Sequence, residues 1–321
     1  MEVTLQLDSV KGKKASSING FIKEMGKNKS LYSMMLPGIL FILLFNYAPM
    51  FGIIVAFKNY TYTKGIFGSE WVGFKNFEFF FTSQDAARVT FNTVFMNLIF
   101  ICTGLFVSVA FALMLNELKN RFFAKLYQSV MFIPYFFSWV VVGYFSFAIL
   151  SVDFGSANSI MKILGMEPVD WYAEPMYWPV ILTIANLWKS TGYGCIIYLA
   201  GITGINEEYY DAAKIDGATR FQQMTRITIP LLVPLISILT LLSIGRIFYA
   251  DFGMFYYLPR QSGVLYSTTD VIDTYVFRSL RTLGDVGMAS AAGLYQSVVG
   301  FILVLLSNLV VKRVNPDNSL F

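Results

Sequence analysis

The chain has 321 residues, of which 56% are hydrophobic and only 14% charged, and its formal net charge is +4. A soluble domain carries about 25% charged residues, so this composition indicates a membrane protein. The absence of histidine excludes H-E-x-x-H zinc sites and Ser-His-Asp triads, and no G-x-x-x-x-G-K-[ST] loop is present to hold nucleotide phosphates. We therefore expect no catalytic residue, no metal site and no nucleotide site in this chain. The small positive charge reports membrane topology rather than nucleic-acid binding.

Six apolar runs are long enough to cross a bilayer, which takes about 20 residues per helix. They are continuous rather than alternating, so we expect an all-α membrane protein with six transmembrane helices. The predicted spans are residues 33–57, 93–115, 129–150, 178–199, 231–249 and 289–311. We assign residues 31–314 to one membrane domain, and residues 1–30 and 315–321 to terminal tails.

Lysine and arginine are concentrated in the short segments on one side of these spans. The tail that ends at Lys29 holds six of them, whereas the eight on the opposite side are spread through much longer loops. By the positive-inside rule, both termini face the cytoplasm. Residues 16–29 mix apolar side chains with lysines, which is typical either of a helix in the headgroup region or of a solvated basic tail.

A polar stretch, YYDAAKIDGATRFQQMTRITIP, separates the fourth and fifth spans. Asn206 can cap a helix there, and Gly217 breaks this helix before a second one runs towards Pro230, where proline is tolerated at a helix start. We expect two short helices that meet at an elbow within residues 206–230. Small residues at an elbow allow close approach of another surface, so the stretch is either a docking hairpin or an ordinary loop between spans.

The core of this stretch, DAAKIDGATRFQQMTRITIP, resembles the EAA loop of permease subunits of type I ATP-binding-cassette importers. In that family the helix before and through the glycine is the coupling helix, which sits in a cleft of the ATPase subunit. Asp211 stands where the family usually has glutamate, which keeps the charge but shortens its reach. The resemblance implies that the contact with the ATPase is made by Asp211, Ala212, Ala213, Asp216, Gly217 and Ala218.

Further segments, including FNYAPMFGIIVAFKNY, FIPYFFSWVVV, WKSTGYGCIIYLAGITGI and DVIDTYVFR, resemble the carbohydrate permeases related to the maltose permease. Within that branch they are similar to the LplB-like subunits associated with complex polysaccharide fragments, such as those of pectin or rhamnogalacturonan. Tyr135 departs from the branch, which often has histidine there. The resemblance implies the type I importer transmembrane fold. It also implies a second permease subunit, two ATPase subunits that hold ATP and Mg²⁺, and an extracellular or periplasmic sugar-binding protein.

Two cations, Lys189 and Arg246, fall within predicted spans, where a charge costs about 2.5–3.5 kcal/mol on insertion scales and is a candidate functional group. Helical spacing places polar side chains beside each cation on one face of its span. These faces resemble those that line the sugar pathway in maltose-type permeases. The predicted pathway residues are Asn186, Lys189, Ser190, Tyr193, Ser243 and Arg246.

Hydroxyl, amide and aromatic groups suit sugar rings, which present polar rims and apolar faces, and two cations would favour acidic sugars such as uronates. Two structural alternatives stay open: Lys189 could extend to a membrane interface, and Arg246 could pair with Asp251.

The expected function is therefore that of a permease subunit, without catalytic activity of its own, in an ATP-driven, binding-protein-dependent importer. Its substrates would be oligosaccharide or polysaccharide fragments, including pectin-like or alginate-like ones, and it would work by alternating access. The alternative is a self-sufficient channel or secondary sugar transporter, which would show inverted repeats and a coupling-ion acid at mid-membrane. Neither feature is evident in the sequence.

Overall fold

A computed structural model of the chain describes residues 27–314. The chain divides into two compact units, residues 1–54 and 55–321, which we describe separately. The predicted tails at 1–30 and 315–321 lie almost entirely outside the described residues.

The described part of the first unit, residues 27–54, is a long helical stretch. Helix α2 (Lys29–Ile42) leads into a π-helical turn (Leu43–Tyr47) and then a 3₁₀ helix (Ala48–Phe57), whose last residues belong to the second unit. The widened π turn ends two residues before Pro49, whose ring would clash with the carbonyl four residues earlier, within that turn, in a regular helix. The whole stretch, Lys29–Phe57, is long and apolar enough to span a membrane.

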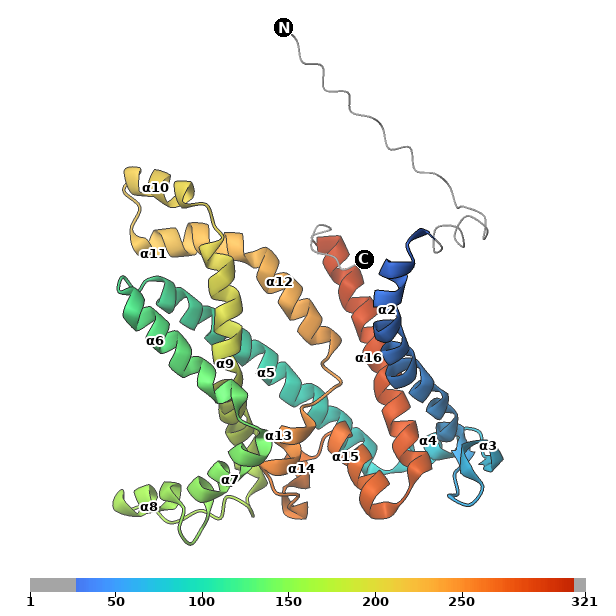
Figure 1. The fold of residues 1–321 in the computed structure, drawn as a ribbon. Helices are drawn as coiled ribbons and strands as arrows, with labels where there is room; N and C mark the ends of the chain where they lie inside the picture. The colour runs from blue at the N-terminus through green and yellow to red at the C-terminus, as the bar shows by residue number, and fades with distance from the viewer. Residues whose placement is uncertain (1–26, 315–321) are drawn as a thin grey trace. The chain divides into compact units, whose positions relative to one another are not determined.

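The second unit consists of helices joined by short turns, together with a two-stranded antiparallel sheet in which Lys58 pairs with Trp71 (Figure 1). The two strands are β1 (Lys58–Asn59) and β2 (Glu70–Trp71). The longest helices are α5 (Gln84–Asn116), α9 (Trp178–Thr203), α12 (Ile229–Gly245) and α16 (Val286–Val314). Shorter helices are α3 (Gly65–Gly68), α4 (Lys75–Thr82), α6 (Arg121–Phe132), α7 (Trp139–Leu150), α8 (Ser156–Ile163), α10 (Glu207–Ile215), α11 (Arg220–Gln223), α13 (Phe252–Tyr257), α14 (Tyr266–Thr269) and α15 (Ile272–Arg278).

Four helical stretches within residues 27–314 are long and apolar enough to cross a membrane: Lys29–Phe57, Gln84–Asn116, Arg220–Gly245 and Val286–Arg313. They correspond to the first, second, fifth and sixth predicted spans. The fourth predicted span lies in α9, which has the necessary length but is not among these four because polar residues, including Asn186, Lys189 and Ser190, interrupt it.

The third predicted span, residues 129–150, is not one straight helix. Its two halves, Arg121–Phe136 and Trp139–Leu150, meet at an angle of 98°. Pro134 has no N–H to donate, so the regular α6 ends at Phe132 and a 3₁₀ turn (Ile133–Phe136) completes the first half. Ser138 begins the second half as an N-cap whose side chain accepts a hydrogen bond from the Val141 N–H. The prediction of a continuous span here was wrong, although the bent pair counts as a fifth span if both halves cross together.

Close helix contacts in the second unit depend on small residues. A Cβ on Gly192 of α9 would lie 2.0 Å from the Met131 carbonyl oxygen, and one on Gly194 would lie 2.5 Å from Ser108 Oγ. Both glycines therefore let α9 approach its neighbours more closely than any larger residue could, as is common between membrane helices. Hydrophobic clusters fill the remaining space, one of them around the fully buried Trp178 and Leu182.

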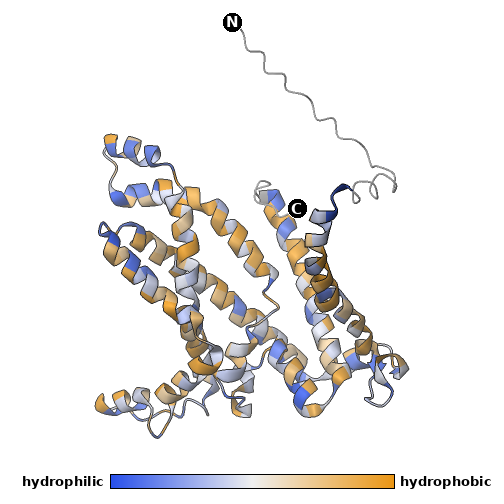
Figure 2. Ribbon diagram, viewed as in Figure 1, coloured by the Kyte–Doolittle hydropathy of each residue, from blue (hydrophilic) through white to orange (hydrophobic). Residues whose placement is uncertain are grey.

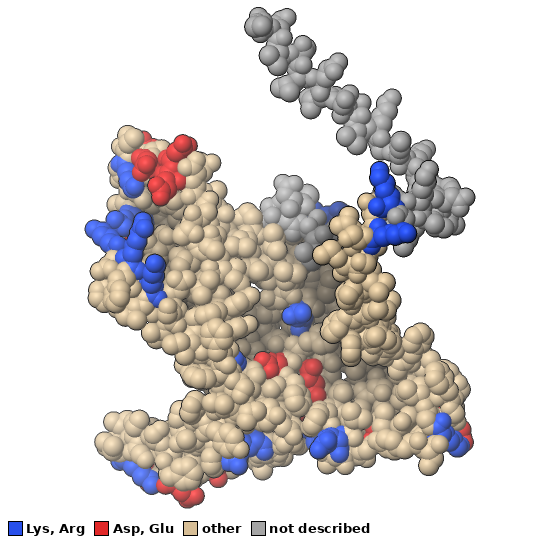
Figure 3. All heavy atoms as spheres, in the orientation of Figure 1, with Lys and Arg blue, Asp and Glu red and all other residues tan. Residues whose placement is uncertain are grey.

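The hydropathy of the second unit is segregated along its length. Figure 2 colours most residues of α12 hydrophobic and most residues of α10 hydrophilic. Figure 3 shows charged side chains gathered near α10 and α11 and again at the opposite end of this unit, with a largely uncharged outer surface between them. This distribution is expected of a membrane protein whose two ends face water and whose middle lies in the bilayer.

Candidate transport pathway and coupling hairpin

A cavity of about 750 Å³ opens between α5, α9 and the end of α12. This volume lies within the range of about 300–1,000 Å³ typical of ligand sites. The described residues that line it supply hydroxyl, amide and aromatic groups and one arginine, but no carboxylate. From the predicted pathway set, the wall includes Asn186, Ser190, Tyr193, Ser243 and Arg246.

Lys189, the sixth predicted pathway residue, does not line this cavity. Its Nζ donates a hydrogen bond to the Tyr135 carbonyl oxygen at 2.7 Å and lies 5.3 Å from the ring centroid of Trp139. The ammonium group is therefore turned towards the bend between α6 and α7. This arrangement satisfies one of its donors and adds cation–π attraction.

An aromatic stack connects the cavity wall to this bend. The ring of Tyr193 stacks on Tyr135 with centroids 4.9 Å apart and planes 11° from parallel, and Tyr135 stacks on Phe132 at 5.6 Å. Tyr193 is 46% exposed, so one face of the stack stays open to the cavity. Such a face can support the apolar side of a sugar ring.

Arg246 is exposed on the cavity wall, and none of the ion pairs among residues 27–314 includes it. The alternative in which Arg246 pairs with Asp251 is wrong in this structure. Asp251 instead accepts a hydrogen bond from Trp139 Nε1 at 2.6 Å and caps the Met254 N–H at the start of α13. The Arg246 guanidinium is left available for an anionic group in the cavity.

The chain is irregular between α12 and α13, at residues 246–251, directly beside the cavity. Broken backbone of this kind must find hydrogen-bond partners at membrane depth. Asn97 of α5 supplies them, because its Nδ2 donates to the carbonyl oxygens of Ile247 at 2.8 Å and Tyr249 at 3.2 Å.

Gln296 of α16 and Asp273 of α15 complete the support of this break. Gln296 Nε2 donates to the Phe248 carbonyl oxygen at 2.6 Å and to Asp273 Oδ2 at 3.0 Å, and Asp273 Oδ2 also accepts from the Ala250 N–H at 2.9 Å. Burial raises the pKa of the Asp273 carboxyl, although its hydrogen bonds from Ala250 and Gln296 partly offset that rise.

These supporting residues were absent from the predicted pathway set. Asn97 and Gln296 could have been noticed as amide side chains within two otherwise apolar spans, where a polar group needs an internal partner. Asp273 carried no such signal, because the predicted spans place it in the connection between the fifth and sixth spans, where a carboxylate needs no special explanation.

Replacing Gln296 with leucine should lower the free energy of unfolding by about 1–3 kcal/mol, because the buried Phe248 carbonyl loses its partner. Titration with sodium dodecyl sulfate, followed by circular dichroism, would measure the change. Ser307→Ala is the control in the same helix, since the Ser307 hydroxyl bonds only to its own helix, at Leu303. Equal stability of the two variants would contradict the supporting role of Gln296.

The polar stretch after α9 forms the two helices expected around Gly217, α10 and α11. Asn206 caps α10 by accepting from the Glu208 N–H, and Thr219 caps α11 in a reciprocal capping box with Gln222. Gly217 adopts a left-handed φ of +76°, a conformation that glycine reaches at little cost. The second helix does not stop, however. It continues from Arg220 through a π turn (Met224–Thr228) and α12 to Gly245.

The tip of this hairpin, residues 206–230, which is the candidate coupling segment, is open to its surroundings. None of the residues of α10 is buried, and two apolar side chains, Ile215 at 87% and Phe221 at 69%, are left exposed. Asp211, Ala212, Asp216 and Gly217 are also exposed, whereas Ala213 and Ala218 are half-buried. Figure 3 shows acidic side chains over α10 and basic ones next to them.

Two polar contacts attach the hairpin to the long helices. The Tyr210 hydroxyl lies 2.9 Å from Thr228 Oγ1, in the turn that leads into α12. Arg220 Nη1 lies 2.6 Å from Glu117 Oε2, at the end of α5. Asp211, by contrast, pairs with Lys214 within α10 at 2.9 Å. A displacement of the hairpin would therefore act on both α12 and α5.

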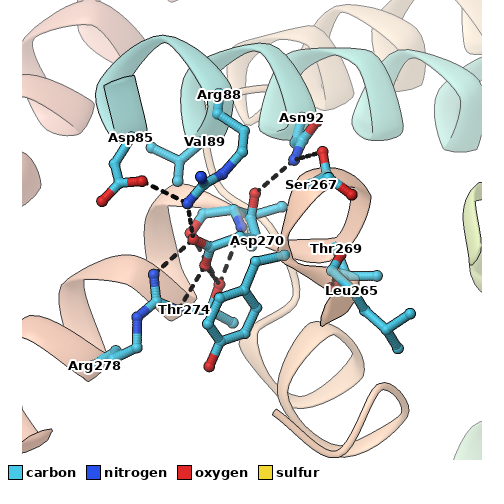
Figure 4. Close-up of polar contacts among 12 residues, drawn as sticks. Asp85, Arg88, Val89, Asn92, Leu265, Ser267, Thr269, Asp270, Thr274 and Arg278 are labelled. Carbon is cyan, nitrogen blue, oxygen red and sulfur yellow. Dashed lines mark hydrogen bonds and ion pairs between the residues drawn. The ribbon is translucent and has the colours of Figure 1, made fainter. Parts of the chain in front are cut away.

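At the opposite end of this unit, a fully buried carboxylate ties α5 to the α14–α15 junction (Figure 4). Asp270 receives two hydrogen bonds from Arg278, at 2.9 and 2.6 Å, one from Arg88 at 3.2 Å and one from Thr274 at 3.0 Å. Asn92 of α5 donates to the Asp270 carbonyl oxygen at 3.0 Å. This cluster is a rigid anchor for one wall of the bundle.

Comparison with known families decides what this arrangement represents. Residues 101–316 match the family model described as the binding-protein-dependent transport system inner membrane component. The chain belongs to this family. It is thus a membrane-embedded transport permease, as the EAA-like motif led us to expect.

Two curated relatives from Bacillus subtilis cover nearly the whole permease. The polygalacturonan/rhamnogalacturonan transport system permease protein YteP is 35% identical over 91% of this chain and 90% of its own length. Protein LplB is 33% identical over 91% of this chain and 91% of its own length. The similarity to the polysaccharide branch inferred from the sequence is confirmed.

The fold of the permease also matches a solved structure. A bacterial ABC transporter involved in the import of the acidic polysaccharide alginate contains a chain that is 32% identical, with a TM-score of 0.85 over 92% of this chain and 99% of that chain. The permease therefore has the transmembrane fold of type I ABC importers.

Proposed function

We propose that the permease imports acidic oligosaccharide fragments, of the pectin or alginate type, as one of two permease subunits in an ATP-driven complex of the bacterial cell membrane. The observation that carries this proposal is the 750 Å³ cavity, whose wall combines sugar-binding groups with the unpaired cation Arg246. Its relatives, named for polygalacturonan, rhamnogalacturonan and alginate, support the acidic class of substrate.

The proposed topology has six spans. The four long apolar stretches, the bent pair α6–α7 as one span and the polar helix α9 as another together give this number. Both termini, with the tails at 1–30 and 315–321, and the coupling hairpin would face the cytoplasm, in keeping with the positive-inside rule.

The partners would supply what this chain lacks. Two ATPase subunits would bind ATP and Mg²⁺ and carry out hydrolysis, and a second permease would complete the pathway. A sugar-binding protein on the outer side would deliver the substrate, as the family description implies.

The mechanism would be alternating access without covalent chemistry. We place Asp211, Ala212, Ala213, Asp216, Gly217 and Ala218 in the ATPase cleft. Closure of the ATPase subunits would displace the hairpin and, through Tyr210–Thr228 and Arg220–Glu117, move α12 and α5 on either side of the cavity. The substrate would then be faced by Asn186, Ser190, Tyr193, Ser243 and Arg246. Lys189 would act beside it through Tyr135, to which it donates a hydrogen bond and on which Tyr193 stacks.

Transport assays in liposomes separate this proposal from a self-sufficient channel or secondary transporter. The complete complex, with its binding protein outside and ATP inside, should accumulate labelled trigalacturonate, whereas this chain alone should not. Uptake by the chain alone, without ATP, would support the channel or secondary transporter instead.

A further inference from the structure

A second, smaller cavity of about 240 Å³ lies between α7 and the end of α13. Both helices are at the end of the second unit opposite α10 (Figure 1), which is the outer end in the proposed topology. The volume falls just below the range of about 300–1,000 Å³ typical of drug-sized ligands, so it suits a single sugar ring. Its wall includes Tyr144, Phe147, Tyr256, Tyr257, Arg260 and Gln261.

The two walls of this cavity are held close together. A Cβ on Gly143 of α7 would lie 2.9 Å from the Tyr257 carbonyl oxygen, and one on Gly253 of α13 would lie 2.7 Å from Trp139 Cδ1. Each glycine therefore lets a backbone pass next to the opposing helix. These close contacts hold α7 and α13 together beside the cavity.

The backbone after α13 is strained at the cavity wall. Arg260 and Gln261, neither of them glycine, both have a φ of 55°. Such residues are uncommon in the left-handed region, and strain of this kind is concentrated at functional sites. The turn is held by hydrogen bonds from the Ser262 N–H to the Pro259 carbonyl at 3.1 Å and from the Tyr266 hydroxyl to the Gln261 carbonyl at 3.3 Å.

This turn places the Arg260 guanidinium over an aromatic ring. Arg260 Cζ lies 4.0 Å from the ring centroid of Phe147. The residue is exposed, and none of the ion pairs found in the described part of the chain involves it. Its orientation is set by the ring, while its N–H donors are left for another acceptor.

We propose that this cavity is an outer subsite that binds the carboxylate of one uronate residue as the fragment enters the permease. The guanidinium fork of Arg260 matches a carboxylate in a bidentate manner. The rings of Tyr144, which is 71% exposed, and Tyr257 offer apolar faces to the sugar. The inference rests on the proposed function, because a uronate subsite at the outer end serves an importer of acidic fragments.

Calorimetric titration of trigalacturonate into the complete complex, held in nanodiscs without its binding protein, tests this subsite. Wild type should bind, and Arg260→Gln should weaken binding about tenfold or more. Arg260→Lys should recover part of the loss, because it keeps the charge without the fork. Arg281→Gln removes another exposed arginine, which does not line this cavity, and should bind as wild type does.

A comparison of two ligands on the wild-type complex does not depend on whether a variant folds. The methyl ester of trigalacturonate, which has lost its negative charges, should bind the wild-type complex at least about tenfold more weakly than the acid. Equal binding of acid and ester, or equal binding by wild type and a folded Arg260→Gln variant, would overturn the subsite.

The proposed function is judged separately, by ATP-driven uptake. Uptake of trigalacturonate without binding at this subsite would leave the importer intact and reject the subsite. Absence of both would reject the acidic substrate class and the subsite together.

Discussion

Replacing Gly217 with valine is expected to abolish the stimulation of ATP hydrolysis by sugar in the complete complex. Gly217 has a φ of +76°, a region that β-branched residues enter only at a cost of about 1–3 kcal/mol. A Cβ here would meet no atom within 4 Å, so the cost comes from the backbone and not from a clash. The chain can relieve it by changing the angle between α10 and α11, which displaces the exposed tip from the ATPase cleft.

Asparagine at the same position provides the matched control. Asparagine tolerates the left-handed region far better than valine, so Gly217→Asn should keep most of the coupled hydrolysis and uptake. Both variants should assemble, as size-exclusion chromatography of the complex would verify. If Gly217→Val keeps wild-type coupling, the hairpin is an ordinary loop and its assignment as the coupling helix fails.

Removing the buried carboxylate should have the largest effect on stability. Asp270 is fully buried between Arg88, whose side chain is 32% exposed, and Arg278, at 22%. Asp270→Asn keeps the shape but leaves Arg278 without a counter-charge and Arg88 with only the partly exposed Asp85. Breaking a buried pair in this way costs about 3–5 kcal/mol. A detergent or denaturant titration of the purified permease should show this loss.

Asp85→Asn serves as the control for this prediction. Asp85 also pairs with Arg88, at 2.7 Å, but its side chain is 42% exposed and the pair lies within one helix. Exposed pairs contribute about 0–1 kcal/mol, so this variant should unfold nearly as wild type does. A similarly small effect for Asp270→Asn would mean that the arginines find other partners and that the cluster is no anchor.

The hairpin could be predicted from sequence because its signals are local. Asn206 and Gly217 specify the start of one helix and the turn after it through their own backbone preferences. The bend between α6 and α7 could not be predicted in the same way, because the span was predicted from the mean hydropathy of residues 129–150. One proline and one N-cap residue hardly change that mean. Helix α9 differs from the other predicted spans: it has the length of a span, but polar residues that line the cavity lower its average hydropathy.

The cavity was only partly predictable, since helical spacing fixes a face and not what that face meets. Asn186, Ser190 and Tyr193 share a wall as expected, whereas their neighbour Lys189 is drawn aside by the Tyr135 carbonyl. That contact depends on the bend between α6 and α7. The orientation of Arg260 likewise depends on a strained turn and on Phe147, far away in the sequence.

The most direct test of the account is ATP hydrolysis by the reconstituted complex, with its binding protein, across a panel of neutral and uronate-containing oligosaccharides. We predict stimulation by the uronate fragments, and a half-saturating concentration about tenfold higher after Arg246→Ala, because the charge of the cavity wall is lost. Stimulation by neutral sugars alone would leave an importer without an acidic pathway. Hydrolysis that responds to no oligosaccharide would contradict the assignment to carbohydrate import.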